Sequence, residues 1–133
     1  MRAFLALAVA VPVVVYAGCR LAVLERRLPL DTMVGRLRRV RRLPAALAVP
    51  GAYAAVVDRL LRWLPPHRRM GRCVKRSLLL LELLSRCGLA PTFHYGVGRD
   101  EAGVRRAHAW LGGVAPGLPT GAPEAGYVET LVV

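Results

Sequence analysis

The sequence predicts an α+β fold, in which a helical N-terminal part is followed by a core with a small antiparallel sheet. Apolar or amphipathic runs without an alternating pattern fill roughly the first two thirds of the 133 residues, which indicates helices. After Pro91 the pattern alternates over residues 92–98 and 104–111, and the polar stretch 99–103 separates the two segments, as in a β-hairpin. A chain of this length forms one domain.

Residues 3–19 are uncharged and apolar, with Pro12 inside the run. The run is at the lower limit for a helix that crosses a membrane, although residues 21–24 lengthen it. A signal peptide needs a small-residue cleavage site, and Tyr16 fits a lipoprotein pattern poorly. A membrane anchor is favoured by the arginines that follow, which would hold this flank in the cytoplasm. We favour a buried helix or a peripheral membrane contact over a true span.

Residues 26–42 predict a basic amphipathic helix, because apolar side chains recur at helical spacing with arginines opposite. Its apolar positions are Leu30, Met33, Val34, Leu37 and Val40. We expect Asp31 or Thr32 to cap its start. The basic face is either solvated, attracted to anionic lipid or docked on an acidic partner.

The core is expected to follow a proline-containing linker. A helix over residues 52–64 places apolar side chains inward, and the prolines of residues 65–69 then break the chain. We therefore divide the chain into residues 1–50, an N-terminal segment of apolar helix, basic helix and linker, and residues 51–133, the core.

Residues 74–86 predict a helix that is buried over most of its circumference, because leucine fills many positions and no proline or glycine precedes Gly88. Gly88 is typical of the left-handed residue that ends a helix. The start falls near Cys73, where unpaired backbone N–H groups and the helix dipole favour a thiolate over a thiol. Lys75 and Arg76 in the first turn act in the same direction.

Cys73 has two interpretations, a reactive nucleophile or a small packing residue, since free cysteine is among the most buried residue types. Cys87 lies at the opposite helix end, where the dipole disfavours a thiolate, so we interpret it as a packing residue. A helix rises about 1.5 Å per residue, which separates the two sulfurs by about 21 Å and excludes a disulfide between them.

The second strand of the hairpin places His108 between two alanines, with Arg106 and Trp110 on the same face. The small neighbours leave room for a helix end to approach, and Trp110 would then form a wall of the site. A lone strand histidine is more often a structural hydrogen-bonding residue than a base, and His94 on the partner strand is a weaker competitor. A last strand within residues 127–133 is expected to close the sheet beside His108.

These segments carry a family pattern: a cysteine followed by an Arg-Ser-Leu helix, a glycine after that helix, a Gly-Val strand and an Ala-His-Ala-Trp strand. The matching residues are Cys73, Arg76, Ser77, Leu78, Gly88, Gly96, Val97, Ala107, His108, Ala109 and Trp110, together with Leu118–Gly121 and Tyr127 near the end. Over residues 53–133 the chain resembles the short, split form of the lasso-peptide B proteins. These are transglutaminase-like cysteine peptidases that cut the leader from a lasso-peptide precursor.

The resemblance implies a transglutaminase- or papain-like core with Cys73 as nucleophile and His108 as base. It also implies a precursor peptide as substrate, a separate leader-recognition protein and a lasso cyclase as partners, and no cofactor. Many members carry a catalytic aspartate about a dozen residues after the histidine, but Thr120 stands near that position. Thr120, Glu124 or a backbone carbonyl is then left to orient the imidazole, with Glu129 as a further acid.

Composition limits the other classes of function. Three cysteines fit no disulfide framework and indicate a reducing compartment, so we expect a cytoplasmic protein. The sequence has no CxxC or HxxxH motif, so we expect no metal. The net charge is +12, but aromatic residues suited to base stacking are sparse, so we do not expect nucleic acid as a partner. Two alternatives to a peptidase remain, a catalytically degenerate basic module that docks on a membrane or partner, and an acyl transferase on the same fold.

Overall fold

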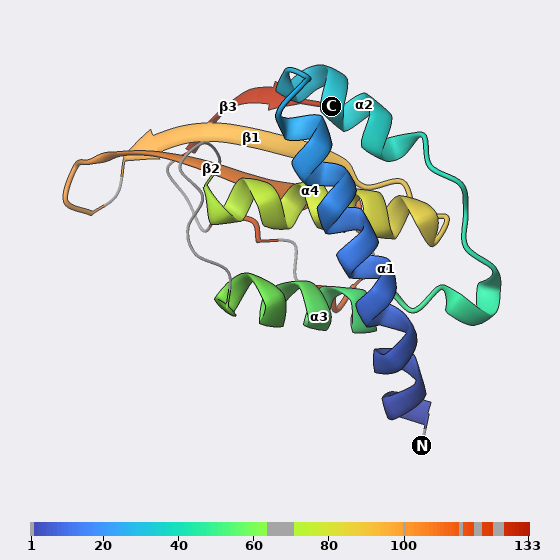
Figure 1. The fold of residues 1–133 in the computed structure, drawn as a ribbon. Helices are drawn as coiled ribbons and strands as arrows, with labels where there is room; N and C mark the ends of the chain where they lie inside the picture. Colours follow the sequence, from blue (N-terminus) through green and yellow to red (C-terminus); the bar gives the residue numbers. More distant parts are fainter. Residues whose placement is uncertain (1, 64–70, 100, 115, 119–120, 124–126) are drawn as a thin grey trace.

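The computed structural model of the chain describes residues 2–63, 71–99, 101–114, 116–118, 121–123 and 127–133, with side chains from residue 6 onward. Its helices are α1 (Arg2–Glu25), α2 (Leu30–Arg38), η1 (a 3-10 turn, Ala45–Leu47), α3 (Pro50–Trp63) and α4 (Arg72–Arg86). The strands β1 (Thr92–Arg99), β2 (Arg105–Gly112) and β3 (Tyr127–Val132) form one antiparallel sheet. Figure 1 shows the helices and the small sheet, which confirm the predicted α+β fold.

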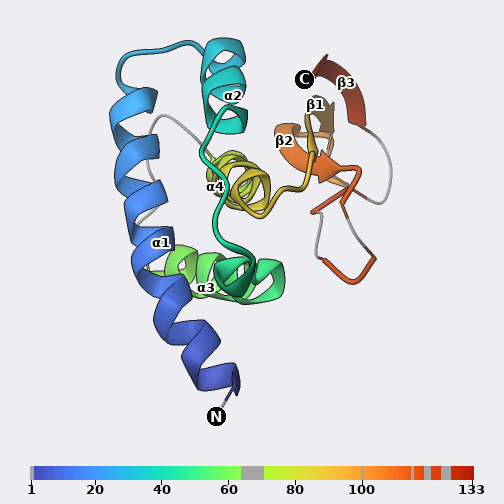
Figure 2. The same cartoon turned by 90° about the vertical axis from the view of Figure 1, so that its right-hand side faces the viewer.

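Helix α4 lies at the centre of the molecule. In Figure 2 it is seen end-on, with α1, α2 and α3 around one side and the sheet on the other. Every side chain from Ser77 to Leu84 is buried, which confirms the prediction from the leucine run. Gly88 follows the helix with a φ of 84°, the left-handed conformation expected there.

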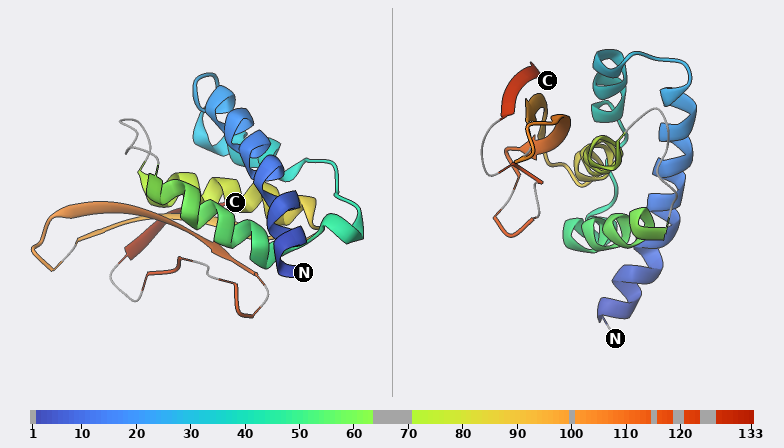
Figure 3. Two further views of the ribbon diagram at one scale, coloured as in Figure 1. Left: turned by 60° about the horizontal axis from the view of Figure 1, so that its bottom comes forward. Right: turned by 90° about the vertical axis from the view of Figure 1, so that its left-hand side faces the viewer.

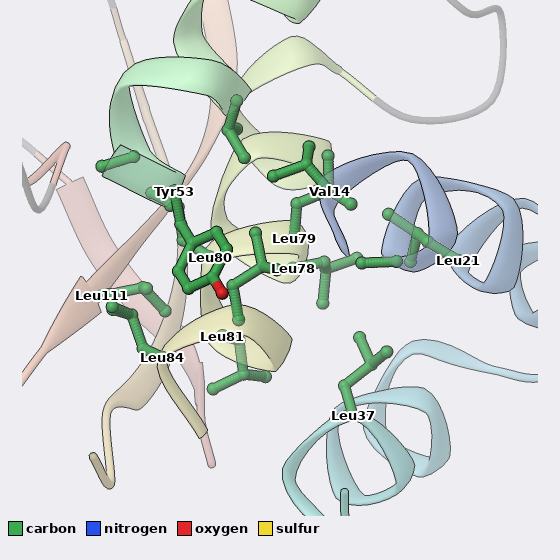
Figure 4. Packing of buried hydrophobic residues seen from close by; sticks show 14 of the residues in the cluster. Val14, Leu21, Leu37, Tyr53, Leu78, Leu79, Leu80, Leu81, Leu84 and Leu111 are labelled. Carbon is green, nitrogen blue, oxygen red and sulfur yellow. The ribbon is translucent and has the colours of Figure 1, made fainter. Parts of the chain in front are cut away.

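The core joins all the helices to the sheet. Figure 4 shows the leucines of α4 surrounded by labelled side chains from α1, α2, α3 and β2, namely Val14, Leu21, Leu37, Tyr53 and Leu111. Burying one such side chain fully contributes about 1.5–3 kcal/mol relative to leaving it in water. The position of α4, and therefore of its first turn, is consequently fixed from several directions.

The core also contains a carboxylate that the sequence analysis did not anticipate. Glu82 is fully buried, and its Oε1 accepts hydrogen bonds from Arg20 at 2.9 Å and from Arg86 at 2.7 Å. A buried charge is tolerated only when it is paired. Arg20 is the one charged residue within residues 3–24, so this ion pair ties the apolar helix α1 to α4.

The two N-terminal helices pack on the same core. Helix α1 buries the stripe Ala10, Val14, Ala17 and Leu21, and α2 buries Met33, Val34 and Leu37. Helix α2 begins directly after Pro29, which takes the N-cap position without a side-chain hydrogen bond. The expectation that Asp31 or Thr32 caps this helix is therefore wrong, because the fixed φ of Pro29 starts the helix earlier. The Thr32 hydroxyl instead lies 3.5 Å from the carboxylate of Asp31.

The sheet has the strand order β2-β1-β3. His108 of β2 pairs with Gly96 of β1, which in turn pairs with Glu129 of β3. The last strand therefore pairs with β1 and lies one strand away from His108, not directly beside it as the sequence analysis expected. Figure 3 shows the helices on one side of the sheet and the connection after β2 on the other.

Alternation along the strands gives the sheet two different faces. Ala109 and Leu111 are buried on the face toward α4. His94, His108 and Trp110 project from the opposite face, which the connection after β2 partly covers.

Candidate active site

The start of α4 lies against β2. The Sγ of Cys73 is 3.9 Å from the carbonyl oxygen of Ala107, and Ser77, one turn later, donates a hydrogen bond to the carbonyl of Ala109 at 3.0 Å. Because Ser77 is buried, this bond fixes the helix to the strand. Cys73 is thus held, half-buried, at the N-terminus of a buried helix, beside the strand that carries His108.

Three groups hold the ring of His108. Its Nε2 lies 2.6 Å from the carbonyl oxygen of Gly121. The ring also stacks on Trp110, with 6.0 Å between centroids, and contacts the ring of Tyr127 at 5.5 Å. Because a carbonyl only accepts hydrogen bonds, Nε2 carries the proton and Nδ1 is the acceptor of the neutral ring. Nδ1 is therefore the nitrogen that is free to take a proton from a thiol.

The structure brings Cys73 to the residue next to His108, but the two side chains share no hydrogen bond. Ala107 immediately precedes His108, and standard backbone dimensions then put the sulfur within about 6 Å of the His108 backbone nitrogen. The imidazole itself leaves β2 on the face away from α4. The predicted nucleophile therefore contacts the residue next to the predicted base, while the two side chains lie on opposite faces of β2.

The third member of the site is a backbone group among the residues described. Thr120 and Glu124, the candidates from the sequence, lie outside the described residues. Gly121, next to position 120, holds His108 through its carbonyl, which is one of the expected possibilities. Gly121 has a φ of +73°, and a Cβ at this position would lie 3.2 Å from Nη1 of Arg76. The Cα of Gly121, whose carbonyl holds the imidazole, thus faces an arginine of α4.

Arg76 connects this segment to α3. Its Nε is 2.6 Å from Oδ1 of Asp58 and its Nη2 is 3.2 Å from Oδ2, which is a two-point ion pair. A chain of contacts therefore leads from Asp58 through Arg76 and Gly121 to His108. Asp58 could not be recognised from the sequence, because nothing in the local pattern of its helix distinguishes it from a solvated acid. The presence of Arg76 in the family pattern was the only signal.

His94, the weaker candidate for the base, has a different partner. Its Nδ1 is 2.9 Å from Oε1 of Glu129, and its ring stacks on Trp110 with 5.5 Å between centroids. Trp110 therefore lies between two histidine rings. It rests on Gly96, where a Cβ would come 3.2 Å from the indole and 2.9 Å from the carbonyl oxygen of Val128. Glycine is needed at this position for the tryptophan to lie flat against the sheet.

A groove of about 520 Å³ lies on the sheet beyond the start of α4. It is lined by Val97, Gly98, Arg99, Arg105, Val128 and Thr130. Val97 pairs with Ala107, whose carbonyl contacts the sulfur of Cys73, so one lining residue of the groove lies one strand away from the thiol. Figure 1 shows that the β1–β2 hairpin extends past the start of α4 here. The groove combines apolar side chains with two arginines.

Cys87, interpreted from the sequence as a packing residue, lies at the other end of α4. Burial raises the pKa of its thiol, which keeps the sulfur protonated at neutral pH. Burial also raises the pKa of Tyr53, with a smaller contribution in the same direction from Cys87 and an opposing one from Arg86. The Tyr53 hydroxyl donates a hydrogen bond to the carbonyl of Leu47 at 2.6 Å.

Among the described residues, no group of three His, Cys, Asp or Glu side chains is arranged to hold a metal ion. The thiol of Cys73 contacts the carbonyl of Ala107, and the imidazole of the next residue, His108, contacts the carbonyl of Gly121.

Comparison with known proteins gives one match. The sequence model of the Transglutaminase-like superfamily matches residues 13–131, which is nearly the whole chain. No curated protein and no solved structure matches it. The matched residues include Cys73, His108 and almost all of the sheet.

Proposed function

The chain belongs to the transglutaminase-like superfamily, and from this premise we propose that it is a cysteine peptidase that removes the leader peptide from a lasso-peptide precursor. The superfamily includes cysteine peptidases and acyltransferases. The observation that best supports thiol chemistry is the position of Cys73 at the start of α4, beside the strand whose histidine is held through Nε2. The lasso-peptide substrate is supported by the resemblance within residues 73–111.

In the proposed reaction Nδ1 of His108 takes the proton of Cys73, and the thiolate attacks the scissile carbonyl carbon. The C–N bond then breaks as His108 gives the proton to the leaving amine, and a thioester remains on Cys73. Water adds to the thioester, releases the carboxylic acid and restores the thiol. The mechanism requires the thiol and the imidazole to close to hydrogen-bond distance when the peptide binds.

Backbone groups perform the two remaining roles. The N–H of Cys73 belongs to the first turn of α4, whose N–H groups have no partner within the helix, and it is the proposed donor to the oxyanion. The Gly121 carbonyl takes the place of the missing aspartate, because it fixes which nitrogen of His108 carries the proton. Asp58 and Arg76 support that carbonyl from the side of α3 as positioning residues.

The groove lined by Val97, which pairs with the neighbour of His108, is the proposed site for the precursor peptide. Its valines suit an extended peptide with small apolar residues, while Arg99 and Arg105 at its far end suit a carboxylate. We further propose a separate leader-recognition protein and a lasso cyclase as partners, because the resemblance is to the split form of the family. We place the proposed reaction in the cytoplasm. Trp110 forms a wall of the proposed site, because its ring stacks on that of His108.

Acyl transfer is the second candidate, because the thioester on Cys73 is common to both reactions and the superfamily contains both activities. The outcome depends on whether water or a substrate amine reaches the thioester. A basic binding module without catalysis is the third candidate, motivated by the net charge of +12 and the missing aspartate.

Mass spectrometry of a lasso precursor incubated with the chain and its leader-recognition protein tests the proposal. Two peptides whose masses sum to the precursor plus water are expected, and Cys73→Ala should abolish them while Cys87→Ala retains them. A gain of substrate mass would show acyl transfer instead. An unchanged precursor, or cleavage that survives Cys73→Ala, would refute the peptidase.

A further inference from the structure

Most of the outer half of α1 is uncovered in the described part of the chain, and the guanidinium of Arg86 lies over one of its rings, 5.3 Å from the centroid of Tyr16. The large exposed side chains of this half are Leu7, Val11, Val15, Tyr16 and Val23, which are 40–57% exposed. Ala8, Pro12, Cys19 and Ala22 are exposed between them. At about 100° per residue these positions form one continuous half of the helix, about 24 Å long. An apolar surface of this extent on a soluble protein marks a contact surface.

The inner half of α1 is fastened to the fold. The stripe Ala10, Val14, Ala17 and Leu21 is buried, and Arg20 turns inward to Glu82. A second ion pair, 3.4 Å long, joins Glu25 to Lys75. Because its one arginine points into the core, the outer face of α1 has no charged side chain from residue 7 to residue 24. The helix presents this face as part of a folded domain and not as a loose tail.

Cations surround one end of this apolar face. Arg26 and Arg27 are exposed directly after α1. Helix α2 lies beside the same end of α1 in Figures 1 and 2, and it exposes Arg36. Arg39, Arg41 and Arg42 are exposed just after α2. The surface therefore combines a long apolar stripe with an adjacent positive rim, within a chain whose net charge is +12.

We propose that the outer face of α1 docks the folded domain on a membrane that contains anionic lipid. The apolar side chains enter the boundary between headgroups and acyl chains, and the arginines that follow α1 bind the anionic headgroups. Figure 2 shows α1 along the outer side of the molecule, with α4 between it and the sheet. Cys73 and the groove beside β2 therefore remain open to the cytoplasm while α1 is docked.

The geometry favours docking over a transmembrane helix. In the described part of the chain Ala6–Glu25 is the one helix with the length and composition to cross a membrane, and 22% of that window is buried. A span would remove the stripe from the core and separate Arg20 from Glu82. A buried carboxylate would then lose one of its two cations, which is strongly unfavourable.

A lipid surface also fits better than a second protein molecule. The outer face contributes almost no polar side-chain groups that would set the register of a protein interface, apart from the Tyr16 hydroxyl and the Cys19 thiol. The positive rim complements anionic headgroups, whereas two copies of this chain placed face to face would bring their rims together with like charge.

Co-sedimentation of the full chain with vesicles tests this proposal. We expect at least tenfold tighter partition onto phosphatidylcholine vesicles with about 30% phosphatidylglycerol than onto pure phosphatidylcholine. The double variant Val11→Glu/Val15→Glu should lower the partition onto anionic vesicles at least tenfold. Val104→Glu/Val128→Glu is the matched control, because it makes the same charge change at exposed valines just before β2 and in β3. This variant should lower the partition onto anionic vesicles less than threefold.

A second measurement leaves the apolar side chains of the outer face unchanged. Cys19 is exposed on the outer face, so an environment-sensitive dye can be attached to it after Cys73 and Cys87 are replaced by serine. Docking predicts a blue shift on anionic vesicles and quenching that is strongest for brominated lipids near the headgroups. No shift, or strongest quenching at the bilayer centre, would overturn the proposal. So would self-association in solution that Val11→Glu/Val15→Glu abolishes while the wild-type chain does not sediment with vesicles.

Discussion

Replacing Asp58 with asparagine tests whether α3 positions the imidazole of His108, the proposed base. In the structure the Asp58 carboxylate accepts two hydrogen bonds from Arg76, at 2.6 and 3.2 Å, and Arg76 packs against Gly121, whose carbonyl holds Nε2 of His108. Asparagine retains the shape and one acceptor but removes the charge. Arg76 should then be held less firmly, and the Gly121 carbonyl should lose its support.

The structure allows the effect on stability to be separated from the effect on activity. A charge-assisted pair is worth about 1.5–3 kcal/mol when buried, but the Asp58 and Arg76 side chains are 35% and 18% exposed, so solvent screening reduces this to about 1 kcal/mol. For a domain of this size that loss lowers the midpoint of thermal unfolding by about 4 °C. Loss of imidazole orientation should lower the cleavage rate more, by about tenfold, equivalent to about 1.4 kcal/mol of activation free energy.

The assay compares Asp58→Asn with Glu25→Gln, which breaks another ion pair to the first turn of α4 without touching the connection after β2. Both variants should unfold a few degrees below the wild type, yet Asp58→Asn alone should slow precursor cleavage and the alkylation of Cys73 by iodoacetamide near neutral pH. Equal rates for the two variants would refute the positioning role of Asp58. If His108→Ala also left the alkylation rate unchanged, the proposed peptidase itself would fail.

Three further predictions follow from the core, Cys87 and the groove. In denaturant titration, Glu82→Ala should lower the free energy of unfolding by about 3 kcal/mol, because it leaves Arg20 and Arg86 without their carboxylate acceptor. The control Glu101→Ala, at an exposed residue, should change the free energy of unfolding by less than about 0.5 kcal/mol. Burial raises the pKa of Cys87, so its thiolate forms at higher pH in the folded than in the unfolded chain. Peptide mapping at about pH 8 should therefore find Cys87 alkylated more slowly than exposed Cys19. The difference between the two rates should disappear in denaturant. Arg105→Glu should raise the KM for acidic precursors about tenfold with kcat nearly unchanged, whereas Arg39→Glu, far from the groove, should not.

The parts of this structure that follow from local pattern were predictable from the sequence. The leucine run specified a buried α4, Gly88 specified its end, and alternation on both sides of a polar turn specified the hairpin. These signals are local, because each depends on residues within a few turns or one strand. They also placed Cys73 at a helix start and His108 on a strand, but they did not show which groups contact these two side chains.

The features that could not be predicted are contacts between residues far apart in the chain. Glu82 and Arg20 are 62 residues apart, and Arg76 and Asp58 are 18 apart, so no periodic pattern relates them. The pairing of β3 with β1 was also outside local reach, because a long connection leaves the strand order open. The sequence left a buried helix and a peripheral membrane contact open for α1, because the segment is apolar all round. In the described part of the chain the other elements cover only one side of it.

The imidazole of His108 contacts a neutral acceptor, the Gly121 carbonyl, where many family members have an aspartate. An aspartate fixes the tautomer of the imidazole and also stabilises the imidazolium that forms, whereas the Gly121 carbonyl supplies mainly the first effect. A serine hydroxyl needs both, since it holds its proton firmly. A thiol ionises near neutral pH, with a reference pKa of about 8.5, and therefore needs less help from its base. Papain-like proteases operate with a neutral asparagine in the third position. The absence of the carboxylate is consequently compatible with a cysteine nucleophile at position 73 and would not be compatible with serine there. Cys73→Ser should therefore abolish the proposed precursor cleavage as completely as Cys73→Ala.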